Sequence, residues 1–414
     1  MKTITVLLDG AGDRSYSELN HQTPLQYAKT PILDKLALKS QCGLMTPYQL
    51  GCSLGTDLAH FLLFGYDMSE YPGRAVIDAI GEGHEFDEAT LILRASFADV
   101  DERDGYYLNS RFTKDLSDDE VKTLCDILSI EMDGYKFSVH HSYDSHALIF
   151  VKGPKLSCQI SDSDPFYNNQ YVMCVEPFET EAEEAMTTAE LMNKYLKNAH
   201  ALLGQHPINI KRQASGLEQG NMLLSKWAGM SKSIEPFAVR SGMTGLLLGQ
   251  STLLEGLTKT IGLGYEAYDN FEEGIQQALT ADAEYIHLHT KAPDSASHKK
   301  DPFKKVAALE SIDAQLAPLL NFDGLLIVTA DHATPCAGKM IHSGETVPFM
   351  ASGTYIRRDD VTAFDEVSCS KGSVTLKGLD FMHYIQNATD RGTLYHLRAG
   401  GKWRNYRVRT VNKL

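Results

Sequence analysis

The chain has 414 residues, of which 43% are hydrophobic and 22% charged, a composition typical of a globular protein with one large core or two modest ones. Its formal net charge of −15 excludes a dominant nucleic-acid footprint, because binding phosphate backbones needs concentrated Lys and Arg, but it is compatible with a small anionic substrate. No stretch approaches the ~20 apolar residues that span a bilayer, and the first residues enter a strand without the features of a secretion signal, so we expect no membrane partner.

The cysteines are scattered along the sequence, are odd in number and form no C-x-x-C motif. This distribution is typical of buried thiols in a reducing compartment rather than of a disulfide framework. We therefore expect a cytoplasmic protein. The cysteines are Cys42, Cys52, Cys125, Cys158, Cys174, Cys336 and Cys369.

The first part of the chain predicts a β–loop–α unit followed by a turn and a second helix. Residues 4–8 are a largely apolar run with the length of a buried strand, and Pro31 opens a helical pattern over residues 31–37. A glycine-rich turn begins at Gly51 and leads into residues 58–64, whose apolar side chains recur at helical spacing.

The pattern of apolar and polar residues changes between residues 86 and 175. Short alternating runs such as 91–97 and 147–151 are separated there by turns rich in Asp and Gly. Such alternation indicates a smaller α+β domain inserted into the first one. We therefore divide the chain into a main α/β domain, residues 1–85 and 176–414, and an inserted α+β domain, residues 86–175.

A long helix is predicted over residues 180–203, and the alternation of predicted strands and helices resumes after it. Another helix is expected over residues 301–320. Helices that alternate with apolar strands indicate an open sheet whose strands run mostly parallel. The carboxyl ends of parallel strands gather along one edge of such a sheet, where ligands bind. The strands expected in this part cover residues 237–239, 245–248, 285–289 and 325–329.

The tail from Thr393 is basic and contains no acidic residue. It is either a solvated terminal strand or a contact for an anion or a second subunit. Its basic residues include Arg398, Lys402, Arg404, Arg407 and Arg409.

Three of the apolar runs lead into carboxylates and imidazoles, and the first run lies hundreds of positions from the others. Because these runs are expected to end at one sheet edge, we predict that the side chains meet there. Three carboxylates and three imidazoles suit a pair of hydrolytic or phosphoryl-transfer metals better than a structural zinc. The predicted ligands are Asp9 after the first run, Asp294 and His298 after the second, and Asp331, His332 and His342 after the third.

Taken singly, these ligands have simpler interpretations. Asp9 can cap a helix in the following loop, and Asp294 and His298, four residues apart, can form a surface ion pair on a helix. Asp331 and His332 are more specific, because a buried Asp needs a cation nearby. Neighbouring residues on an extended backbone point in opposite directions, so these two can serve two different ions.

A turn between Gly51 and Gly55 places a candidate nucleophile. Thr56 follows the turn at the start of an apolar helix, where backbone N–H groups and the helix dipole favour anions. A neighbouring metal would lower the pKa of its hydroxyl and let it attack at neutral pH. Without metals Thr56 is an ordinary N-cap residue, and Ser53 is the rival hydroxyl.

In their order along the chain, these motifs resemble the metal-dependent phosphotransferases of the alkaline phosphatase superfamily, in particular the archaeal-type cofactor-independent phosphoglycerate mutases. The resemblance covers most of the chain, and the ordered set of metal ligands is its most specific part. The motifs are Asp9-Gly10, Gly55-Thr56-Asp57, Gly65-Tyr66-Asp67, Gly73-Arg74, His206-Pro207-Ile208-Asn209, His289-Thr290-Lys291-Ala292-Pro293-Asp294 with His298, Thr329-Ala330-Asp331-His332 and His342-Ser343.

The resemblance implies an alkaline-phosphatase-like α/β fold, a doubly wound and mostly parallel sheet with an inserted cap domain, that holds two divalent metal ions (Mn, Zn, Mg or Co). One ion would be held by Asp9, Thr56, Asp331 and His332, and the other by Asp294, His298 and His342. The family's mutases, which belong to glycolysis, hand phosphate to the nucleophile and return it to a different oxygen of the same substrate. The expected catalytic residues are Thr56, Arg74 and Lys291, and the expected substrate contacts in and near the cap are Arg94, Arg111, His146 and Lys226.

The segments expected to bind the substrate depart from the family's pattern. The usual nucleophile of this branch is Ser, whereas this chain has Thr56, a residue type that other members of the superfamily use. A Tyr-Arg-His pattern appears here as Tyr-Asp-Ser-His at 143–146, Pro-His-Asp is replaced near 163–165, and Arg-Gly-Ala-Gly becomes Lys-Trp-Ala-Gly at 226–229. Because Lys and Ser cannot reproduce the bidentate fork of Arg, two cationic contacts are altered.

We therefore expect an enzyme that transfers a phosphoryl group with two metals through a phospho-Thr56 intermediate, most simply a phosphoglycerate-mutase-like phosphomutase. The alternatives are a metal-dependent phosphatase or phosphonate hydrolase acting on another small phosphorylated metabolite, and a non-catalytic binding homologue. The retained cap domain, which can close over a substrate and exclude water, favours the mutase. The sequence leaves the substrate, the native metal and the oligomeric state open.

Overall fold

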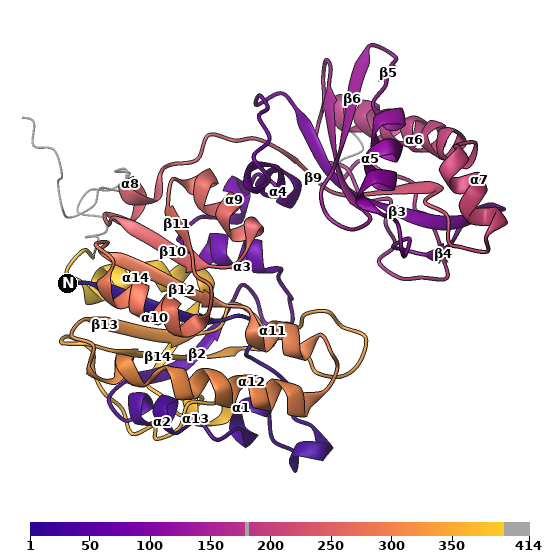
Figure 1. The fold of residues 1–414 in the computed structure, drawn as a ribbon. Coiled ribbons are helices and arrows are strands. Elements are labelled where there is room, and N and C mark those ends of the chain that lie inside the picture. Colours follow the sequence, from indigo (N-terminus) through magenta and orange to yellow (C-terminus); the bar gives the residue numbers. More distant parts are fainter. Residues whose placement is uncertain (179–181, 393–414) are drawn as a thin grey trace, which may run out of the picture. The chain divides into compact units, whose positions relative to one another are not determined.

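The computed structural model describes residues 1–178 and 182–392, which form two compact units (Figure 1). Unit 1 consists of Met1–Tyr71 together with the described part of Ile234–Leu414. Unit 2 is the continuous segment Pro72–Ser233. The chain therefore leaves the first unit once, completes the second, and returns.

Unit 2 is longer at both ends than the predicted insertion over residues 86–175. At its C-terminal end, strand β9 (Met222–Met230) pairs along most of its length with β3 (Leu91–Arg103). At its N-terminal end, α4 (Arg74–Gly81) packs its apolar side chains against Ile92 and neighbouring residues. The boundary expected from local composition is corrected accordingly, because composition does not record the pairing of distant strands.

The sheet of unit 1 has eight strands in the order β11-β10-β12-β1-β13-β14-β2-β15. At its centre β1 (Thr3–Leu8) lies parallel to β12 (Tyr285–Thr290) on one side and to β13 (Leu325–Thr329) on the other. The carboxyl ends of these three strands therefore share one edge, as the sequence predicted. The sheet is mostly parallel, since only β14 (Val347–Ser352) runs antiparallel to its neighbours β13 and β2. The other strands are β2 (Gln41–Thr46), β10 (Gly245–Gly249), β11 (Gly264–Ala267) and β15 (Val374–Lys377).

Helices cover both faces of this sheet, as a doubly wound fold requires (Figure 1). On one face, His60 of α3 (Thr56–Leu63) packs against His287 of β12, with ring centroids 5.0 Å apart. On the other face, α10 (Phe271–Thr280) approaches Leu288 so closely that a Cβ at Gly274 would lie 3.0 Å from it. Successive residues of a strand point to opposite faces, so the two helices lie on opposite sides. The remaining α-helices are α1 (Pro24–Tyr27), α2 (Pro31–Ala37), α8 (Phe237–Ser241), α9 (Thr252–Ile261), α11 (Ala292–Ser297), α12 (Pro302–Gln315), α13 (Glu366–Cys369) and α14 (Gly378–Ala388).

Unit 2 is built on a seven-stranded antiparallel sheet in the order β5-β6-β7-β3-β4-β8, with β9 paired to β3. Its core is aromatic and aliphatic, and the rings of Phe137 and Tyr195 stack there with centroids 3.9 Å apart. The unit thus has a core of its own. Its other elements are β4 (Gly105–Ser110), α5 (Asp118–Leu128), β5 (Glu131–Met132), β6 (Tyr135–His141), β7 (His146–Lys152), β8 (Gln170–Tyr171), α6 (Glu183–Gly204) and α7 (Pro207–Ala214).

Two predicted elements differ from the structure. The strand expected over residues 237–239 is the short helix α8, which follows Pro236 and ends at Gly242, a glycine with a φ of 77°. Three apolar residues are too few to separate strand from helix, and the flanking Pro and Gly favour the helix. The helix expected over 301–320 ends at Gln315, where the chain continues into a 3₁₀ turn.

Some predictions fall partly or wholly outside the described residues. The helix expected over 180–203 is α6, which begins at Glu183, and residues 179–181 are not described. The basic tail from Thr393 also lies outside the described residues. None of the described helices combines the length and apolar character needed to cross a membrane.

The cysteines are all free thiols, but they are not all buried as predicted. Cys52 and Cys174 are exposed, and Cys158 is half-buried. Both exposed cysteines lie in loops, where a residue's sequence neighbourhood says little about its burial. The buried thiols are Cys42, Cys125, Cys336 and Cys369.

Candidate functional site

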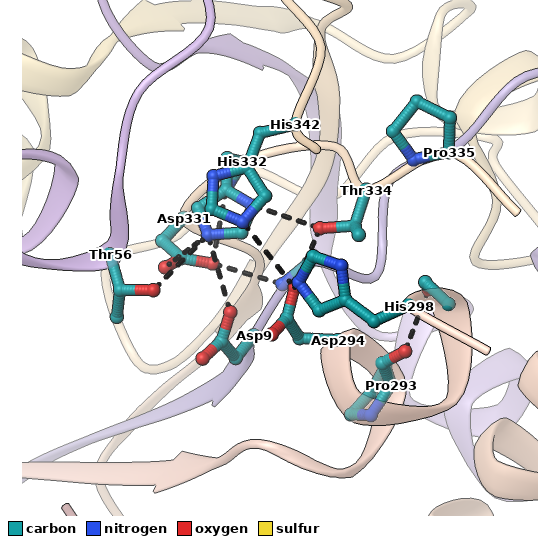
Figure 2. Close-up of polar contacts among 12 residues, drawn as sticks. Asp9, Thr56, Pro293, Asp294, His298, Asp331, His332, Thr334, Pro335 and His342 are labelled. Carbon is teal, nitrogen blue, oxygen red and sulfur yellow. Dashed lines mark hydrogen bonds and ion pairs between the residues drawn. The ribbon is translucent and has the colours of Figure 1, made fainter. Parts of the chain in front are cut away.

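The six predicted carboxylates and imidazoles lie together at the carboxyl edge of the unit 1 sheet, in two clusters (Figure 2). Within each cluster the candidate ligand atoms lie within 4.8 Å of one another. The structure thus brings together side chains from three separate strand ends. The first cluster contains Asp9, Asp331 and His332, all buried, and the second contains Asp294, His298 and His342, of which only Asp294 is buried.

A glycine turn positions Asp9 at the end of β1. Gly10 has a φ of 62°, a conformation that favours glycine, and a Cβ there would lie 2.4 Å from Oγ1 of Thr334 and 3.0 Å from Oδ1 of Asp294. Only glycine therefore lets the loop pass this close to both clusters. The backbone N–H of Gly10 donates to Oδ1 of Asp331 at 3.0 Å, which ties the loop after β1 to the loop after β13.

Asp331 and His332 lie in one cluster, the grouping that the resemblance implied, and the possibility that an extended backbone directs them to two different ions does not hold. Strand β13 ends at Thr329, so the two residues lie on a bend rather than on an extended backbone. The backbone N–H of His332 donates to the Asp331 carboxylate at 3.0 Å. Nε2 of His332 then lies 3.3 Å from Oδ2 of Asp331 and 3.3 Å from Oδ1 of Asp9.

The second cluster forms around Asp294 on α11. His298 follows the helix directly, and its Nε2 lies 3.1 Å from Oδ1 of Asp294. His342 approaches the same oxygen with Nε2 at 3.6 Å. Nδ1 of His342 lies 2.7 Å from the carbonyl oxygen of Leu54, so that nitrogen must carry the proton and donate. The lone pair on Nε2 is therefore directed into the cluster, as metal ligation requires.

Thr334 joins the two clusters. Its hydroxyl donates to Oδ1 of Asp294 at 2.9 Å and lies 3.2 Å from Nδ1 of His332. A hydroxyl has one proton to give, so it accepts the second bond from Nδ1–H of His332. That tautomer leaves the Nε2 lone pair of His332 facing Asp9 and Asp331. Both oriented imidazoles are thus prepared to bind a cation.

The electrostatics of the first cluster favour a bound cation. Burial and the charge of Asp9 raise the pKa of Asp331 well above its usual range. Burial also acts to raise the pKa of Asp9, but the hydrogen bond from Nε2 of His289, at 3.0 Å, and its charge outweigh that effect and lower it. Burial and the neighbouring His342 lower the pKa of His332 to about 4, so it is neutral at pH 7.

Two carboxylate oxygens in this cluster test whether a metal fits. Oδ1 of Asp9 and Oδ2 of Asp331 are buried and accept no hydrogen bond from any described residue. Buried polar atoms of this kind nearly always have a partner, and leaving a carboxylate oxygen without one is costly. Hard oxygen ligands next to an imidazole nitrogen suit a divalent cation. The residues present therefore fit a metal ion.

The candidate nucleophile lies beside the first cluster. Thr56 is the first residue of α3, is largely buried, and places Oγ1 3.3 Å from Nε2 of His332. One turn later, Nδ1 of His60 lies 2.7 Å from the carbonyl oxygen of Thr56 and holds the start of the helix. The rival hydroxyl, Ser53, is exposed in the preceding loop. The geometry thus favours Thr56 over Ser53.

A buried network behind the clusters was not anticipated from the sequence. Lys305 on α12 is fully buried, and its Nζ donates to the carbonyls of Gly12 and Thr334 and to the carboxylate of Asp13, each at 3.0 Å. It therefore joins the loops that carry both clusters. Asp13 in turn donates its backbone N–H to Glu366 at 3.1 Å, a carboxyl whose pKa burial raises to about 7.

The sequence does contain a signal for Lys305. Lys305, Leu309 and Ile312 are spaced i, i+4 and i+7, so they share one face of α12, and all three are buried. A lysine on the apolar face of a helix needs an acidic or carbonyl partner inside the protein. Nothing in the local sequence identifies that partner, because Asp13 lies almost three hundred residues away.

Unit 2 contains a group of basic side chains that we call the cationic cluster: Arg74, Arg94, Arg111, His146 and Lys226. The structure brings these five predicted residues together with two buried aspartates. Nε and Nη2 of Arg111 donate to the two oxygens of Asp164 at 2.7 and 2.8 Å, and Nζ of Lys226 donates to the same carboxylate at 2.8 Å. Burial, which outweighs the nearby Asp164, lowers the pKa of Lys226 to about 8.

The other half of the cationic cluster is organised by Asp78. Nη1 of Arg94 donates to Oδ2 of Asp78, and Nε of Arg74 lies 3.6 Å from the same oxygen. Arg94 faces Lys226 directly across the β3–β9 pair, so the two halves are adjacent. His146 completes the group. Its burial and the nearby charge of Arg94 lower the pKa of this imidazole to about 3, so it is neutral at pH 7.

Of the three predicted catalytic residues, only Lys291 belongs to none of these clusters. It is the N-cap residue of α11, three residues before Asp294, and its side chain is exposed. Its contact with phosphate therefore stays a prediction.

Comparisons with known proteins identify the family of the chain. Residues 37–209 match the family model described as 2,3-bisphosphoglycerate-independent phosphoglycerate mutase. The chain is 46% identical to the 2,3-bisphosphoglycerate-independent phosphoglycerate mutase 2 of Methanocaldococcus jannaschii, over 98% of this chain and 97% of that protein. It is 34% identical to mutase 1 of the same organism, over 94% of this chain and 98% of that protein.

A solved structure also resembles the whole chain. The cofactor-independent phosphoglycerate mutase from Thermoplasma acidophilum is 29% identical, covers 94% of this chain and 100% of its own, and superimposes with a TM-score of 0.64. The likeness extends over both units. An identity of 29% over 94% of this chain indicates a closer relationship than a shared fold alone.

Proposed function

The chain belongs to the family of 2,3-bisphosphoglycerate-independent phosphoglycerate mutases and is an isomerase-class phosphomutase, and we propose that it interconverts 3-phosphoglycerate and 2-phosphoglycerate through a phosphothreonine at Thr56. In the forward direction Oγ1 of Thr56 gives up its proton and attacks phosphorus, the bond to O3 of the substrate breaks, and O3 takes up a proton. The phosphoryl group then passes from Thr56 to O2 of the same glycerate, which loses its proton as Oγ1 regains one. The hydroxyl of Thr56 is restored, so no phosphate is gained or lost.

We assign the two clusters of unit 1 to two divalent ions. Asp9, Thr56, Asp331 and His332 would hold one ion, and Asp294, His298 and His342 the other. When bound, such ions polarise phosphate oxygens and favour the ionised form of the nucleophilic hydroxyl. The two buried carboxylate oxygens without a hydrogen-bond donor support this assignment.

The chain's own groups prepare Thr56 for attack. The start of α3 directs backbone N–H groups and the positive end of the helix dipole toward an incoming anion. The His60 side chain fixes the first turn through the Thr56 carbonyl, which limits the positions of the hydroxyl. Holding a nucleophile in a near-attack position accounts for a large part of the rate enhancement in phosphoryl transfer.

We propose that the cationic cluster of unit 2 binds the anionic groups of the substrate. Arg94, Arg111, His146 and Lys226 are its substrate contacts, and Arg74 and Lys291 assist at the phosphate. Asp164 holds the Arg111 guanidinium in place through two hydrogen bonds, and Arg94 and Lys226 share one face of the sheet. Buried cations grouped around few carboxylates favour the entry of an anion.

A single observation supports this function most strongly: six ligand-type side chains from three strand ends meet beside a buried threonine hydroxyl. The direct test is incubation with 3-phosphoglycerate and Mn²⁺, followed by phosphorus NMR. We expect the 2-phosphoglycerate resonance to appear without a matching rise in inorganic phosphate. Inorganic phosphate as the sole new product would reject the mutase and favour a phosphohydrolase.

The nucleophile is tested by a matched pair of variants. Thr56→Ala removes the hydroxyl and should abolish turnover, whereas Thr56→Ser keeps a hydroxyl and should retain activity. Acid quenching of the working enzyme, followed by peptide mass spectrometry, should locate phosphate on Thr56. Phosphate on another residue, or unchanged turnover in Thr56→Ala, would contradict the assignment.

A further inference from the structure

Two large aromatic residues of unit 2 adopt a backbone conformation that normally belongs to glycine. The φ of Phe166 is 63° and that of Trp227 is 55°. A side chain at positive φ is crowded against its own backbone, and for a bulky residue this is uncommon and strained. Such strain persists only where the surroundings hold it in place, and it concentrates at functional sites.

The surroundings of both residues are defined. Trp227 lies in a β-bulge, where the β3–β9 register shifts between Ile92 and Arg94. Its backbone N–H donates to Oδ1 of Asp162 at 2.7 Å. The backbone N–H of Phe166 donates to Oδ1 of Asp164 at 2.9 Å. Two aspartates of one short segment therefore hold both strained peptides, and one of them also binds the cations.

The two rings face the cationic cluster, and neither is part of the hydrophobic core of unit 2. The guanidinium carbon of Arg74 lies 4.7 Å from the Trp227 ring centroid, and Nζ of Lys226 lies 5.2 Å from it. Arg111 lies 4.7 Å from the Phe166 centroid. The rings are 6.1 Å apart and both are half-buried. Aromatic faces at these distances attract cations and keep water from them.

The charges within this arrangement leave room for an anion. Arg111 and Lys226 share the single carboxylate of Asp164, so these three groups carry one net positive charge, which the half-buried Asp162 beside Lys226 offsets in part. Asp164 is fully buried and Lys226 is 2% exposed, so bulk water does little to compensate that charge. The two rings thus border a buried group of cations and carboxylates rather than filling the core of unit 2.

We propose that Phe166 and Trp227 form an aromatic rim that determines specificity, admitting a compact oxyanion, carboxylate or phosphate, to Arg111 and Lys226 while excluding bulkier anionic groups. Glycine would adopt the φ of position 227 without strain. The indole therefore costs backbone strain, and we attribute its role to its contacts with the cations rather than to folding. The inference rests on the proposed function, which assigns Arg111 and Lys226 to the anionic groups of the substrate and supplies 3-phosphoglycerate as the probe.

Trp227 can report on its own occupancy, because the chain has only two tryptophans, Trp227 and Trp403. In a Trp403→Phe variant all indole emission comes from Trp227. We expect 3-phosphoglycerate and, more weakly, inorganic phosphate to change that emission in a saturable way in the metal-loaded enzyme. The double variant Trp227→Phe, Trp403→Phe, which has no indole, is the matched control and should show no such change.

Substitutions at 227 separate specificity from folding. Trp227→Gly relieves the strained φ, so the thermal midpoint should stay near that of the wild type or rise. Inorganic phosphate and phenylphosphonate are compared as competitive inhibitors of 3-phosphoglycerate turnover. Trp227→Gly should reduce the ratio of their inhibition constants, which measures the preference for inorganic phosphate, by about fivefold or more. Trp227→Phe keeps an aromatic face and should keep most of the preference. A residue that only supports the fold would lower the thermal midpoint and leave the inhibitor ratio unchanged.

The outcomes separate this inference from the proposed function. If 3-phosphoglycerate is not isomerised but Trp227 emission still responds to it or to inorganic phosphate, the mutase assignment fails and the rim stands. If turnover is normal while the emission of Trp227 ignores both ligands, the rim is rejected. An unchanged inhibitor ratio in Trp227→Gly also rejects the rim. The rim is rejected as well if the protein is inactive and Trp227 emission responds to neither 3-phosphoglycerate nor inorganic phosphate.

Discussion

The two charged regions of this protein, the ligand clusters of unit 1 and the cationic cluster of unit 2, satisfy buried charge in different ways. In unit 1, acidic side chains crowd together, and oxygens of Asp9 and Asp331 have no hydrogen-bond donor among the described residues. In unit 2, Arg111 and Lys226 are already paired with Asp164 inside the fold. The first region leaves carboxylate oxygens without a partner, whereas in the second the cations already have carboxylate partners inside the fold.

The comparison predicts that removing charge from each region has different consequences. We expect the ligand clusters to concern catalysis first, because burial and the charge of Asp9 disfavour a second carboxylate at Asp331 until an ion is present. Internal ion pairs such as that of Lys305 concern folding first, because either partner alone is a buried, uncompensated charge.

The largest effect is expected for Asp331→Asn. Turnover of 3-phosphoglycerate should fall by at least about a thousandfold, since the change removes a ligand charge where phosphate charge must be stabilised. The metal-free variant should be as thermostable as the metal-free wild type at neutral pH, or more so, because the raised pKa of Asp331 marks a carboxylate that destabilises the empty fold. Thermal unfolding in chelator measures this. A large loss of stability would show that Asp331 is structural.

The next largest effect is expected for Lys305→Met. This change leaves Asp13 buried without its cation and removes two contacts to loop carbonyls, so the free energy of unfolding should fall by about 3–5 kcal/mol. Denaturant unfolding measures the loss. Lys300→Met is the matched control, because Nζ of Lys300 also binds two carbonyls, those of Pro335 and Met340, but from an exposed position. Equal losses in both variants would contradict the buried-pair account.

A moderate effect is expected for Arg111→Lys in the cationic cluster. Lysine keeps the charge but loses the two-pronged contact with Asp164, so the local geometry relaxes without unfolding. We expect KM for 3-phosphoglycerate to rise about tenfold with a smaller change in kcat. Steady-state kinetics at fixed Mn²⁺ measure both constants. A fall in kcat with an unchanged KM would place Arg111 in the chemical step instead.

The smallest effect concerns pH and Lys226, which lies among Arg94, Arg111, His146 and Asp164. Burial lowers the pKa of Lys226 from 10.5 to about 8, so the folded protein loses this proton before the unfolded chain does. Over that window the unfolded chain binds more protons, and the contribution of Lys226 to stability rises with pH. Binding of an anion follows the opposite trend, because the cation is lost as pH passes about 8.

Kinetics at several pH values test this opposition. KM for 3-phosphoglycerate should rise a few-fold between about pH 7 and pH 9.5 in the wild type, while Lys226→Met should have a weaker binding constant with a flatter pH profile. Identical profiles for the two proteins would show that another group controls the change.

The sequence predicted the first region much better than the second, for physical reasons. Asp9, Asp294 and Asp331 follow strands whose apolar pattern is plain, and parallel strands must bring their ends together. The position of Thr56 at the start of a helix was predicted from the glycine turn that precedes it. The hydrophobic pattern alone left open that Asp331 and His332 point to opposite sides, because it does not show that the strand ends at Thr329, whereas the resemblance assigned both to one ion.

The second region depends on pairings that no local pattern contains. Arg94 and Lys226 face each other only because β9 returns to β3 from far along the chain, which is also why the predicted domain boundaries were too narrow. The partners of Arg111 and Lys305 are aspartates distant in sequence. The strained backbone of Trp227 cannot be anticipated at all, since a tryptophan at positive φ contradicts its residue preference.

The most direct measurement of the central claim is the metal content of the wild-type protein, determined by elemental analysis on the same sample whose mutase turnover is assayed. We predict about two divalent ions per active chain, loss of turnover when a chelator removes them, and recovery when Mn²⁺ is restored. Full turnover in a chelated sample with no bound metal would contradict the account, whatever the substrate proves to be.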